Sequence, residues 1–428
     1  MKIRLLLKKR RNIVNMNESK QIITGIDVGT TKIAVIIAEC NNDQITILGH
    51  GISKSIGLDR GEVVDIQNTR ISLNNAIQEA EENAKCKIDS AFIGITGDHI
   101  QGINYSGVVI INENTGSEID DKDIIKVRDR AKSINIPTER KILHVLNQNY
   151  KVDERTNISN PKGLHGRRLE LNAHLVTVAK NSESDLRNCL DSNIYIQGFV
   201  LEPLASAYAV LNKQQRKLGT VLIDIGGGTT DVIIYKNNGI QHSGAISMGG
   251  NIITNDIALG IQEQLGECLE NQYLEKLKHD YGCAKKECID QNQNITINID
   301  GNDLIINQYD LANIIQSRMT EIFNRVQHEI NKSELNSTYG IVITGGGSQL
   351  NNLSDLGQEF FQKNITIGYP RNINGSEEII NNPRFSTAIG LIKYGLETLR
   401  TEDDYGPTVT NIIKDLFTKL RKLYNKWY

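Results

Sequence analysis

The sequence predicts an α/β protein built from two duplicated lobes around a nucleotide cleft. The stretches GIDVGTTKIAVIIAE (25–39) and LIDIGGGTTDVIIYK (222–236) align by eye and share the order strand, Gly/Thr turn, strand. A third passage of this kind, YGIVITGGGSQL (339–350), reads as another strand that ends in a glycine-rich loop. Repeated units usually mean repeated architecture, so two similar lobes that face each other would place both Gly/Thr turns at one cleft.

The two Gly/Thr turns, 27–32 and 224–231, have the composition of phosphate-binding loops. A phosphate needs several backbone N–H groups that converge on one point, and glycine adopts the necessary dihedral angles without strain. The threonines add hydroxyl donors, and Asp27 and Asp224 at the strand ends suit a hydrated Mg²⁺ that bridges phosphates. One such turn is equally typical of a glycine-rich hairpin, but a matched pair in a duplicated unit favours a nucleotide site.

The rest of the chain alternates helical and strand-like segments. A helical pattern covers 69–86, and a strand-like run follows at 90–96. Residues 98–175 then change character, with short strands, polar turns and one predicted helix at 121–133. The polar stretch 401–410 contains a Gly-Pro pair and reads as a linker.

The bulk composition is that of a soluble globular protein. Charged residues make up 23% of the 428 residues and hydrophobic residues 39%. The net charge of −3 argues against a protein that coats nucleic acid, so no nucleic-acid partner is expected. The six cysteines are scattered, and the close pair Cys283 and Cys288 lacks a second pair or a histidine cluster that would complete a zinc site. We therefore expect reduced thiols in a reducing cytoplasm.

The N-terminal segment 1–19 is basic but lacks the apolar region of a signal peptide, because Leu5–Leu7 is its longest apolar run. It reads as a disordered extension, or as the product of a start site placed ahead of the true start at Met16. No segment approaches the length of a membrane span, so a cytoplasmic location without a spanning helix is expected.

The C-terminal segment 411–428, NIIKDLFTKLRKLYNKWY, shows one apolar stripe at helical spacing. The stripe consists of Ile412, Ile413, Leu416, Phe417, Leu420, Leu423, Tyr424 and Trp427. The opposite face carries Lys414, Lys419, Arg421, Lys422 and Lys426 against Asp415, so five basic residues and one acidic residue give a local charge of +4. This pattern predicts an amphipathic helix that lies in the interface of an anionic membrane. The alternative is a terminal helix docked on the protein's own core.

The Gly/Thr turns resemble the two phosphate motifs of the actin superfamily, whose lobes are ribonuclease-H-like. ITGGGSQL (343–350) resembles the adenosine motif of that superfamily, and FVLEPLASAYAVL (199–211) resembles its first connecting helix. The resemblance gives Glu202 the role of orienting the attacking water. It also implies ribose and base contacts for Glu275 and Lys278, for which an ordinary solvated helix face is the alternative.

The predicted site follows from these motifs, with ATP and Mg²⁺ as the implied ligands. The predicted nucleotide-binding residues are Asp27, Gly29, Thr30, Thr31, Lys32, Asp224, Gly226, Gly227, Gly228, Thr229, Thr230, Asp231, Gly249, Gly250, Glu275, Lys278, Gly345, Gly346, Gly347 and Ser348. Asp27 and Asp224 are the predicted metal residues, which act through water. At most a weak ATPase is expected, because no strong general base other than Glu202 is evident.

Among actin-like proteins, the chain most resembles the FtsA family of bacterial cell division proteins. The resemblance rests on RGEVVDI (60–66), ITGDHI (95–100), HVLNQNYKVD (144–153) and NPKGLHGRRLELNAHLVTVAK (160–180), in that order. It covers nearly the whole chain from about residue 20. The chain departs from the family pattern in a longer stretch between 256 and 275.

The resemblance implies a division of the chain into the family's subdomains, with subdomain 1C in place of actin's 1B. The expected parts are an extension at 1–19, subdomain 1A at 20–97 with 176–215 and about 383–400, subdomain 1C at 98–175, subdomain 2A at 216–258 and 336–382, subdomain 2B at 259–335, a linker at 401–410 and a membrane-targeting helix at 411–428.

The expected function is a membrane-bound scaffold in which the nucleotide acts as a polymerisation switch. By resemblance, the protein would form head-to-tail polymers on the cytoplasmic face of the inner membrane at the septum. It would tether FtsZ through subdomain 2B and contact other divisome proteins through subdomain 1C. A small-molecule kinase and a PilM-like pilus scaffold are the alternatives on the same fold.

Overall fold

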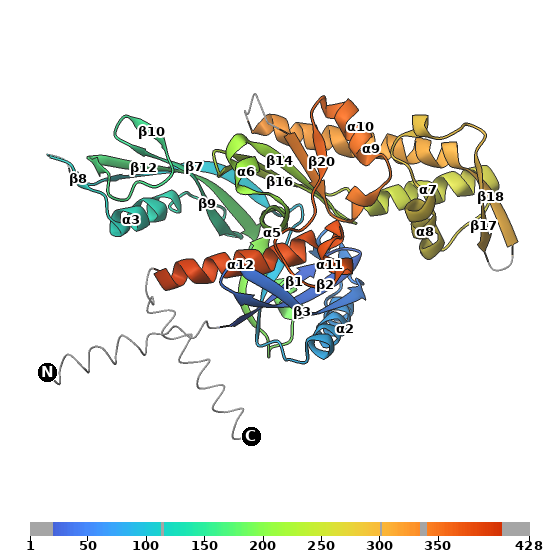
Figure 1. Cartoon of the computed structure of the whole chain (residues 1–428), viewed down its shortest axis with the longest axis horizontal. Helices are drawn as coiled ribbons and strands as arrows, with labels where there is room; N and C mark the ends of the chain where they lie inside the picture. The colour runs from blue at the N-terminus through green and yellow to red at the C-terminus, as the bar shows by residue number, and fades with distance from the viewer. Residues whose placement is uncertain (1–19, 113–114, 300–301, 334–339, 405–428) are drawn as a thin grey trace, which may run out of the picture.

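The computed structural model describes residues 20–112, 115–299, 302–333 and 340–404. Two lobes, each built on a five-stranded sheet, form the centre of the molecule (Figure 1). The first sheet contains β1 (Gln21–Val28), β2 (Lys32–Asn41), β3 (Gln44–Lys54), β6 (Ser90–Ile95) and β13 (Tyr195–Leu201). The second sheet contains β14 (Thr220–Ile225), β15 (Thr230–Lys236), β16 (Gly239–Ile246), β19 (Gly340–Thr344) and β20 (Ile365–Ile367).

The two sheets have the same topology, which confirms the predicted duplication. The strand orders are β3-β2-β1-β6-β13 and β16-β15-β14-β19-β20. In each sheet the first three strands pair antiparallel and the last two join in parallel. The aligned sequence units therefore occupy equivalent strands, β1–β2 and β14–β15.

The central strands are nearly continuous apolar runs because helices cover the sheets. In the first lobe, α2 packs on β2 and β3, whereas α12 packs on β1, β2, β6 and α5. The helices that belong to the two sheets are α2 (Ile66–Ala84), α4 (Lys180–Cys189), α5 (Glu202–Val210), α6 (Lys213–Leu218), α7 (Gly250–Leu265), α9 (Gln308–Lys332), α10 (Leu353–Phe361), α11 (Glu377–Ile380) and α12 (Ser386–Asp404). Short elements complete the lobes: β4 (Leu58–Asp59), β5 (Glu62–Val63) and the 3₁₀ turns η2 (Gly346–Gln349) and η3 (Pro383–Phe385).

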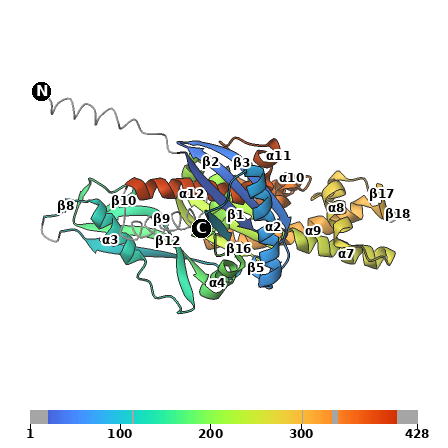
Figure 2. The ribbon, with the colours of Figure 1, turned by 90° about the horizontal axis from the view of Figure 1, so that it is seen from below.

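Two further units lie at opposite ends of the molecule (Figures 1 and 2). One is a four-stranded sheet, ordered β10-β9-β12-β7, against which α3 packs. The whole unit contains β7 (Gln101–Ile110), β8 (Ser117–Glu118), α3 (Asp121–Ala131), β9 (Arg140–Val152), β10 (Arg155–Ile158), β11 (His165–Gly166) and β12 (Arg168–Ala179). The short strands β8 and β11 pair with each other in a separate two-stranded sheet. The other unit contains α8 (Asn271–Tyr281), η1 (Lys286–Cys288), β17 (Asn294–Ile299) and β18 (Asn302–Asn307), together with parts of α7 and α9.

The structure corrects two expectations. The strands within 98–175 are long rather than short, because β7, β9 and β12 each have ten or more residues. Their apolar side chains alternate with polar ones, the pattern of a sheet with one face in solvent, which makes a long strand look broken in the sequence. The predicted linker 401–410 begins too early, since α12 continues to Asp404. The first strong helix-ending signal is the pair Gly406 and Pro407, beyond that point.

The connecting helix α5 ties the lobes together. Leu222, Ile233 and Tyr235 of the second sheet belong to the same buried cluster as the core of the first lobe. Helix α5 contacts β14 and β15 of the second sheet on one side and α12 on the other. The first residue of α5 is therefore fixed at the point where the two lobes meet.

Gly390 sets the distance between α5 and α12. A Cβ atom at Gly390 would lie 1.8 Å from the backbone oxygen of Ala205, so the helices cross too closely for any side chain there. We expect Gly390→Ala to lower the free energy of unfolding by roughly 1–3 kcal/mol, because overpacking forces backbone shifts. Urea unfolding followed by circular dichroism measures this change.

Gly198→Ala is the matched control for Gly390→Ala. A Cβ atom at Gly198 would meet only the Phe92 ring at 3.7 Å, an ordinary contact. The control should stay close to wild-type stability. Equal stability of the two variants would contradict a close helix crossing at Gly390.

Candidate functional site

The two Gly/Thr turns share an equivalent backbone hydrogen bond. Each turn joins the first two strands of its lobe, β1 to β2 and β14 to β15, and is closed by one backbone hydrogen bond. The N–H of Gly29 donates to the carbonyl of Lys32 at 3.1 Å, and the N–H of Gly226 donates to the carbonyl of Thr229 at 2.9 Å. The sequence repeat therefore places equivalent turns at the ends of equivalent strands.

The turns from the two lobes lie in direct contact. A Cβ atom at Gly227 would lie 2.3 Å from Cγ2 of Thr31, and one at Gly228 would lie 2.3 Å from Oγ1 of Thr30. Only glycine allows this approach, because any larger side chain would push the lobes apart. The structure thus brings together both predicted phosphate turns, each with its glycines facing the threonines of the other.

The start of α7 supports the second turn from behind. The N–H groups of Gly250 and Asn251 donate to the carbonyls of Gly226 and Gly227 at 2.9 and 2.8 Å. A Cβ atom at Gly249 would lie 2.7 Å from the same two carbonyl oxygens, so a side chain has no room. The predicted residues Gly249 and Gly250 are therefore adjacent to the turn.

The glycines after β19 pack against β14. Gly345 has a φ of +84°, and a Cβ atom there would lie 2.2 Å from Oδ1 of Asp224. At Gly347 a Cβ atom would lie 2.4 Å from Cγ2 of Ile225. Gly346 is nearest to the side chain of Arg384, and the Ser348 hydroxyl donates to the Gly345 carbonyl at 2.7 Å. The loop that resembles an adenosine motif is thus brought beside the second phosphate turn.

Lys278 of α8 reaches back to the beginning of α7. Its Nζ donates to the Gly250 carbonyl at 3.0 Å and to the Thr254 hydroxyl at 2.6 Å, and it pairs with Glu275 at 2.8 Å. The Lys278 side chain is 16% exposed, whereas that of Glu275 is 43% exposed. The alternative of an ordinary solvated helix face therefore does not describe Lys278.

Four carboxylates are buried where the lobes meet. Asp27 lies on β1, Asp224 on β14, Asp231 on β15 and Glu202 at the first residue of α5, and each residue is less than 9% exposed. Lys32 pairs with Asp27 at 2.8 Å. Burial of this much negative charge with one paired cation is electrostatically costly.

Hydroxyl groups from distant segments hold two of these carboxylates. Ser206 and Thr387 donate to Oδ2 of Asp224, the second at 3.2 Å. Thr96 and Thr229 donate to Asp231 at 2.5 and 3.2 Å. Sequence reasoning missed Thr96, Ser206 and Thr387. They lie on other elements, and no local pattern links them to the turns.

Burial and mutual repulsion shift the acidity of the carboxylates. Burial, reinforced by the charge of Asp27, raises the pKa of Asp224 to about 6, against the Ser206 and Thr387 hydrogen bonds. Burial and the charges of Asp27, Asp231 and Asp224 raise the pKa of Glu202 well above its usual range. Burial likewise raises the pKa of Asp231, and the charge of Asp224 adds to this. The region therefore favours a bound cation or proton uptake.

The carboxylates fit a hydrated divalent cation better than a directly coordinated one. Within the described residues, no three His, Cys, Asp or Glu side chains are grouped so that they could hold a metal ion directly. Mg²⁺ usually keeps several of its waters and binds through one or two carboxylates and substrate phosphates. Asp27 and Asp224, on equivalent strands of the two lobes, are the residues that would hold such an ion through water.

The threonine hydroxyls of the turns differ in what they already bond. Thr30 Oγ1 accepts a hydrogen bond from the N–H of Gly61 at 3.0 Å, so its own hydrogen remains to be donated. The Thr229 hydroxyl donates to Asp231, and the Thr230 hydroxyl donates to the Met248 carbonyl at 2.7 Å. Thr31 is exposed. Thr30 and Thr31 are therefore better placed than Thr230 to donate to a phosphate.

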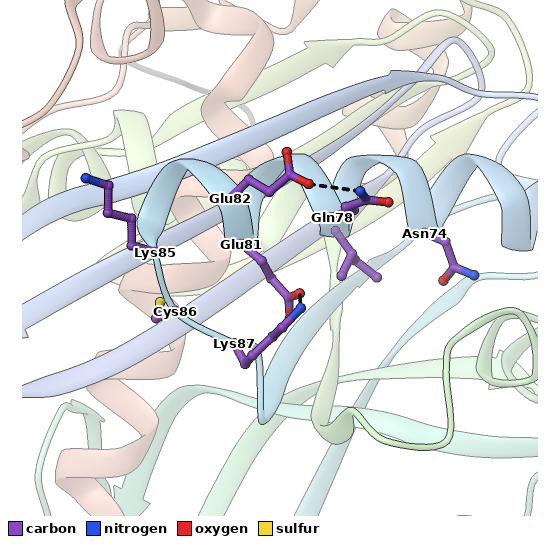
Figure 3. A pocket seen from close by; sticks show the side chains of 8 residues that line it. Asn74, Gln78, Glu81, Glu82, Lys85, Cys86 and Lys87 are labelled. Atoms are coloured by element: carbon purple, nitrogen blue, oxygen red, sulfur yellow. Dashed lines mark hydrogen bonds and ion pairs between the residues drawn. The ribbon is translucent and has the colours of Figure 1, made fainter.

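A separate surface hollow of about 540 Å³ lies at the C-terminal end of α2 (Figure 3). Its polar side chains pair with one another: Gln78 donates to Glu82 at 2.9 Å, and Lys87 donates to Glu81 at 2.5 Å. None of the residues that line it belongs to the Gly/Thr turns. This hollow is not part of the candidate site.

The predicted membrane-binding segment 411–428 and the basic segment 1–19 lie outside the described residues. Among the helices that the structure describes, none combines the length and apolar character needed to cross a bilayer.

Two family models match the chain. The model described as cell division protein FtsA matches residues 221–390, and the model described as the SHS2 domain inserted in FtsA matches residues 97–177. The second range coincides with β7–β12 and α3, the accessory sheet at one end of the molecule.

The similarity extends over most of the chain. The chain is 35% identical over 386 residues to the cell division protein FtsA of Pseudomonas aeruginosa. This match covers 89% of this chain and 90% of the relative. Among solved structures, the chain is similar to a PilM–PilN type IV pilus biogenesis complex, with a TM-score of 0.63 and 14% identity. This match covers 88% of this chain and 99% of the other. The chain is also similar to MreB5 of Spiroplasma citri bound to ADP, with a TM-score of 0.52 and 14% identity over 91% and 100%. These structures confirm the actin-like fold, and they show the fold alone.

The raised pKa of Asp224 predicts a pH-dependent contribution to stability. Because the folded-state pKa of about 6 exceeds the unfolded value near 3.8, this contribution is fully present below about pH 3.8. It is lost as the pH rises through about 6. The free energy of unfolding of nucleotide-free wild type, measured relative to Asp224→Asn, should therefore fall from about pH 4 to 7 and level off above.

Urea unfolding of both proteins at a series of pH values provides this difference. Comparison with the variant cancels the titration of surface acids and of buried histidines. A difference that rises with pH over the same range would contradict the raised pKa.

Proposed function

The chain belongs to the FtsA family of cell division proteins, and from this premise we propose that it is a nucleotide-dependent membrane scaffold. In this proposal it binds ATP with Mg²⁺ between its two lobes. It polymerises head to tail on the cytoplasmic face of the inner membrane at the division septum. There it tethers FtsZ and helps to recruit later divisome proteins.

The observation that carries the nucleotide part is the contact between the two Gly/Thr turns beside buried carboxylates. Gly227 and Gly228 of one turn meet Thr31 and Thr30 of the other, within an actin-like fold. Backbone N–H groups and hydroxyls from both lobes would bind the phosphates. The excess negative charge around Asp224 supports a magnesium ion that bridges the carboxylates and phosphates through water.

The same contact supports a role for the nucleotide as a switch. Because the turns touch, phosphates can enter between them only if the lobes change their relative position. A ligand that contacts both lobes shifts the equilibrium between lobe arrangements through its differential contacts. The helices α5 and α12, which connect the lobes, are where we expect such a hinge motion to be absorbed.

Hydrolysis of ATP is expected to be slow. Glu202 is buried at the start of α5, where it would orient the attacking water. Its raised pKa means that the carboxyl group is readily protonated, and a protonated carboxyl group cannot act as a base. This state supports a weak ATPase in which the nucleotide controls assembly.

Membrane attachment and partner binding are proposed for other parts of the chain. The basic amphipathic segment 411–428 would lie in an anionic membrane interface. The unit within 259–335 is the proposed FtsZ-binding surface, and the unit within 98–175 is the proposed surface for other divisome proteins. The two units lie at opposite ends of the molecule, which leaves both accessible beside a central nucleotide site (Figure 1).

The family membership favours this function over the two alternatives on the same fold. The relatives that share 35% identity are cell division proteins, whereas the pilus complex shares 14% and is alike in fold alone. A small-molecule kinase would also have no use for a basic amphipathic segment at its C-terminus.

Asp224→Ala should weaken the binding of ATP with Mg²⁺ by about 10- to 100-fold, the usual effect of removing an outer-shell metal partner. Isothermal titration of the purified protein with ATP, with and without Mg²⁺, measures this effect. Binding to anionic vesicles should be unchanged, because Asp224 is not part of the proposed membrane-binding segment 411–428.

Asp129→Ala is the matched control for Asp224→Ala. It removes an aspartate of α3 whose exposed side chain pairs with Lys132, in the accessory unit and outside the turns. Unchanged ATP affinity of Asp224→Ala would contradict the proposed metal site.

Removal of residues 405–428 should abolish co-sedimentation with vesicles that contain anionic phospholipid. The full chain should bind, and its binding should weaken as salt rises, because part of the attraction is electrostatic. Equal sedimentation of the full chain and of the 1–404 variant would exclude the tail as the membrane anchor.

A pair of point variants tests whether the apolar stripe inserts. Trp427→Glu places a charge in the apolar stripe, and Asn425→Glu adds the same charge outside it. We expect Trp427→Glu to lose much more vesicle binding than Asn425→Glu. Equal losses would mean that charge alone governs attachment.

A further inference from the structure

A small, partly enclosed cavity lies next to Glu202. It is lined by Glu202, Thr96 and Gly94, by Glu62 of β5 and by His99. Its volume is about 10 Å³, the space that the centre of a single water molecule requires. Carboxylate, hydroxyl and imidazole groups in its wall give such a water the polar partners that it needs. The cavity therefore joins the buried carboxyl of Glu202 to a histidine that is not part of the Gly/Thr turns.

His99 is held with one ring nitrogen paired and the other unpaired. It follows β6 after Gly97, whose φ of +127° turns the chain, and its side chain is 7% exposed. Its Nδ1 lies 2.8 Å from Oε1 of Glu62. Its Nε2 is buried and has no hydrogen-bond partner within the described part of the chain. A buried unpaired nitrogen on a residue that lines a cavity together with carboxyl and hydroxyl groups indicates a water molecule or a proton partner.

The surroundings keep His99 neutral and fix its tautomer. Burial lowers the pKa of His99, Arg140 adds to this effect, and the charges of Glu62 and Asp98 oppose it. Because the Glu62 carboxylate accepts the Nδ1 proton, neutral His99 presents a lone pair at Nε2. Arg140 of β9 also donates to the His99 carbonyl at 2.7 Å and thereby fixes the backbone at this residue. Neutral His99 is thus able to accept a proton at Nε2.

We propose that His99, oriented by Glu62, receives through one cavity water the proton that Glu202 takes up during nucleoside triphosphate hydrolysis. This inference rests on the proposed function, since it assumes that the cleft binds and hydrolyses ATP. His99 does not touch the nucleotide, so it is a positioning residue that acts through Glu202. The relay explains how a buried glutamate with repelling carboxylates around it returns to its charged form after each turnover.

The proton balance of the step is complete. As the attacking water forms its bond to the γ-phosphorus, one of its O–H bonds breaks and the proton passes to Glu202. The bond from the γ-phosphorus to the bridging oxygen breaks, and its electron pair leaves with the diphosphate. Glu202 then gives its proton to the cavity water, which gives one of its own protons to Nε2 of His99. The resulting imidazolium is stabilised by Glu62, which is 42% exposed and in contact with solvent.

The pH dependence of hydrolysis is the readout that separates this role from a structural one. The relay requires neutral His99, so the rate should fall as the pH drops through the lowered pKa of His99, below its ordinary 6.5. Glu62→Gln removes the charge that favours protonated His99, so the pKa of His99 should fall further. The rate of Glu62→Gln divided by the wild-type rate should then rise as the pH falls. Glu202, whose pKa is raised, and the other acids of the cleft titrate in both proteins, so this ratio isolates His99.

The test measures phosphate release by the full chain on anionic vesicles, with ATP and Mg²⁺, from about pH 5 to 9. We expect His99→Gln to slow hydrolysis by about 10- to 100-fold and to leave the ATP affinity unchanged. This loss of rate is at or below the lower end of the range for a general acid–base group. We expect the ratio of the Glu62→Gln rate to the wild-type rate to rise as the pH falls. His328→Gln is the matched control, because His328 is exposed on α9 and should leave both rate and profile unchanged.

Each result decides for or against the relay. A wild-type rate and profile in His99→Gln, or a ratio of the Glu62→Gln rate to the wild-type rate that does not change with pH, would overturn it. Where His99→Gln fails to fold, Glu62→Gln decides, because Glu62 is partly exposed. ATP binding by wild type without phosphate release at any pH would overturn the relay and leave nucleotide binding intact. A wild type that binds no ATP would instead remove the proposed function together with the relay.

Discussion

Three aspartates and a glutamate are buried at the junction of the two lobes, and the arrangement of the whole molecule depends on this concentration of charge. Like charges in a region of low dielectric repel one another strongly, so the site is stable only with protons, hydroxyl donors or a cation. Ser206, Thr387 and Thr96 provide donors, and Lys32 provides one positive charge. The negative charge that remains unpaired favours a bound cation at this junction.

Close backbone packing brings these carboxylates together. The glycines of one turn leave room for the threonine side chains of the other turn. Gly345 lies directly against the side chain of Asp224. Gly390 lets α12 cross α5 in contact with Ala205, which fixes the helix that begins with Glu202. The chain thus places glycine where the lobes meet and large apolar residues inside each lobe. A site formed by two bodies in this way responds to any change in their relative position.

The actin-like core is shared with other protein families, whereas an accessory unit distinguishes this chain from them. Pilus and MreB proteins share the core with this chain at 14% identity, so the core specifies the fold and little more. The match of residues 97–177 to a domain inserted in FtsA proteins is what separates this chain from those neighbours. Its strand β9 also reaches the core, because Arg140 bonds the His99 carbonyl and His144 accepts from the Leu201 N–H just before Glu202. The accessory sheet is therefore in contact with the site that the core provides.

The sequence by itself determined the duplicated fold, the two Gly/Thr turns and the aspartates on their strands, because each depends on local chain geometry and on the repeat. The sequence did not reveal the lengths of β7, β9 and β12, because polar residues alternate with apolar ones along these strands. It also did not reveal the end of α12, which lies four residues inside the expected linker. Only the tertiary structure showed that Thr96, Ser206 and Thr387 hold the buried carboxylates, and that His99 and Glu62 share a cavity with Glu202. These partners are separated from the turns by up to 163 residues, and no periodicity or spacing encodes a contact that forms only when the two lobes pack together.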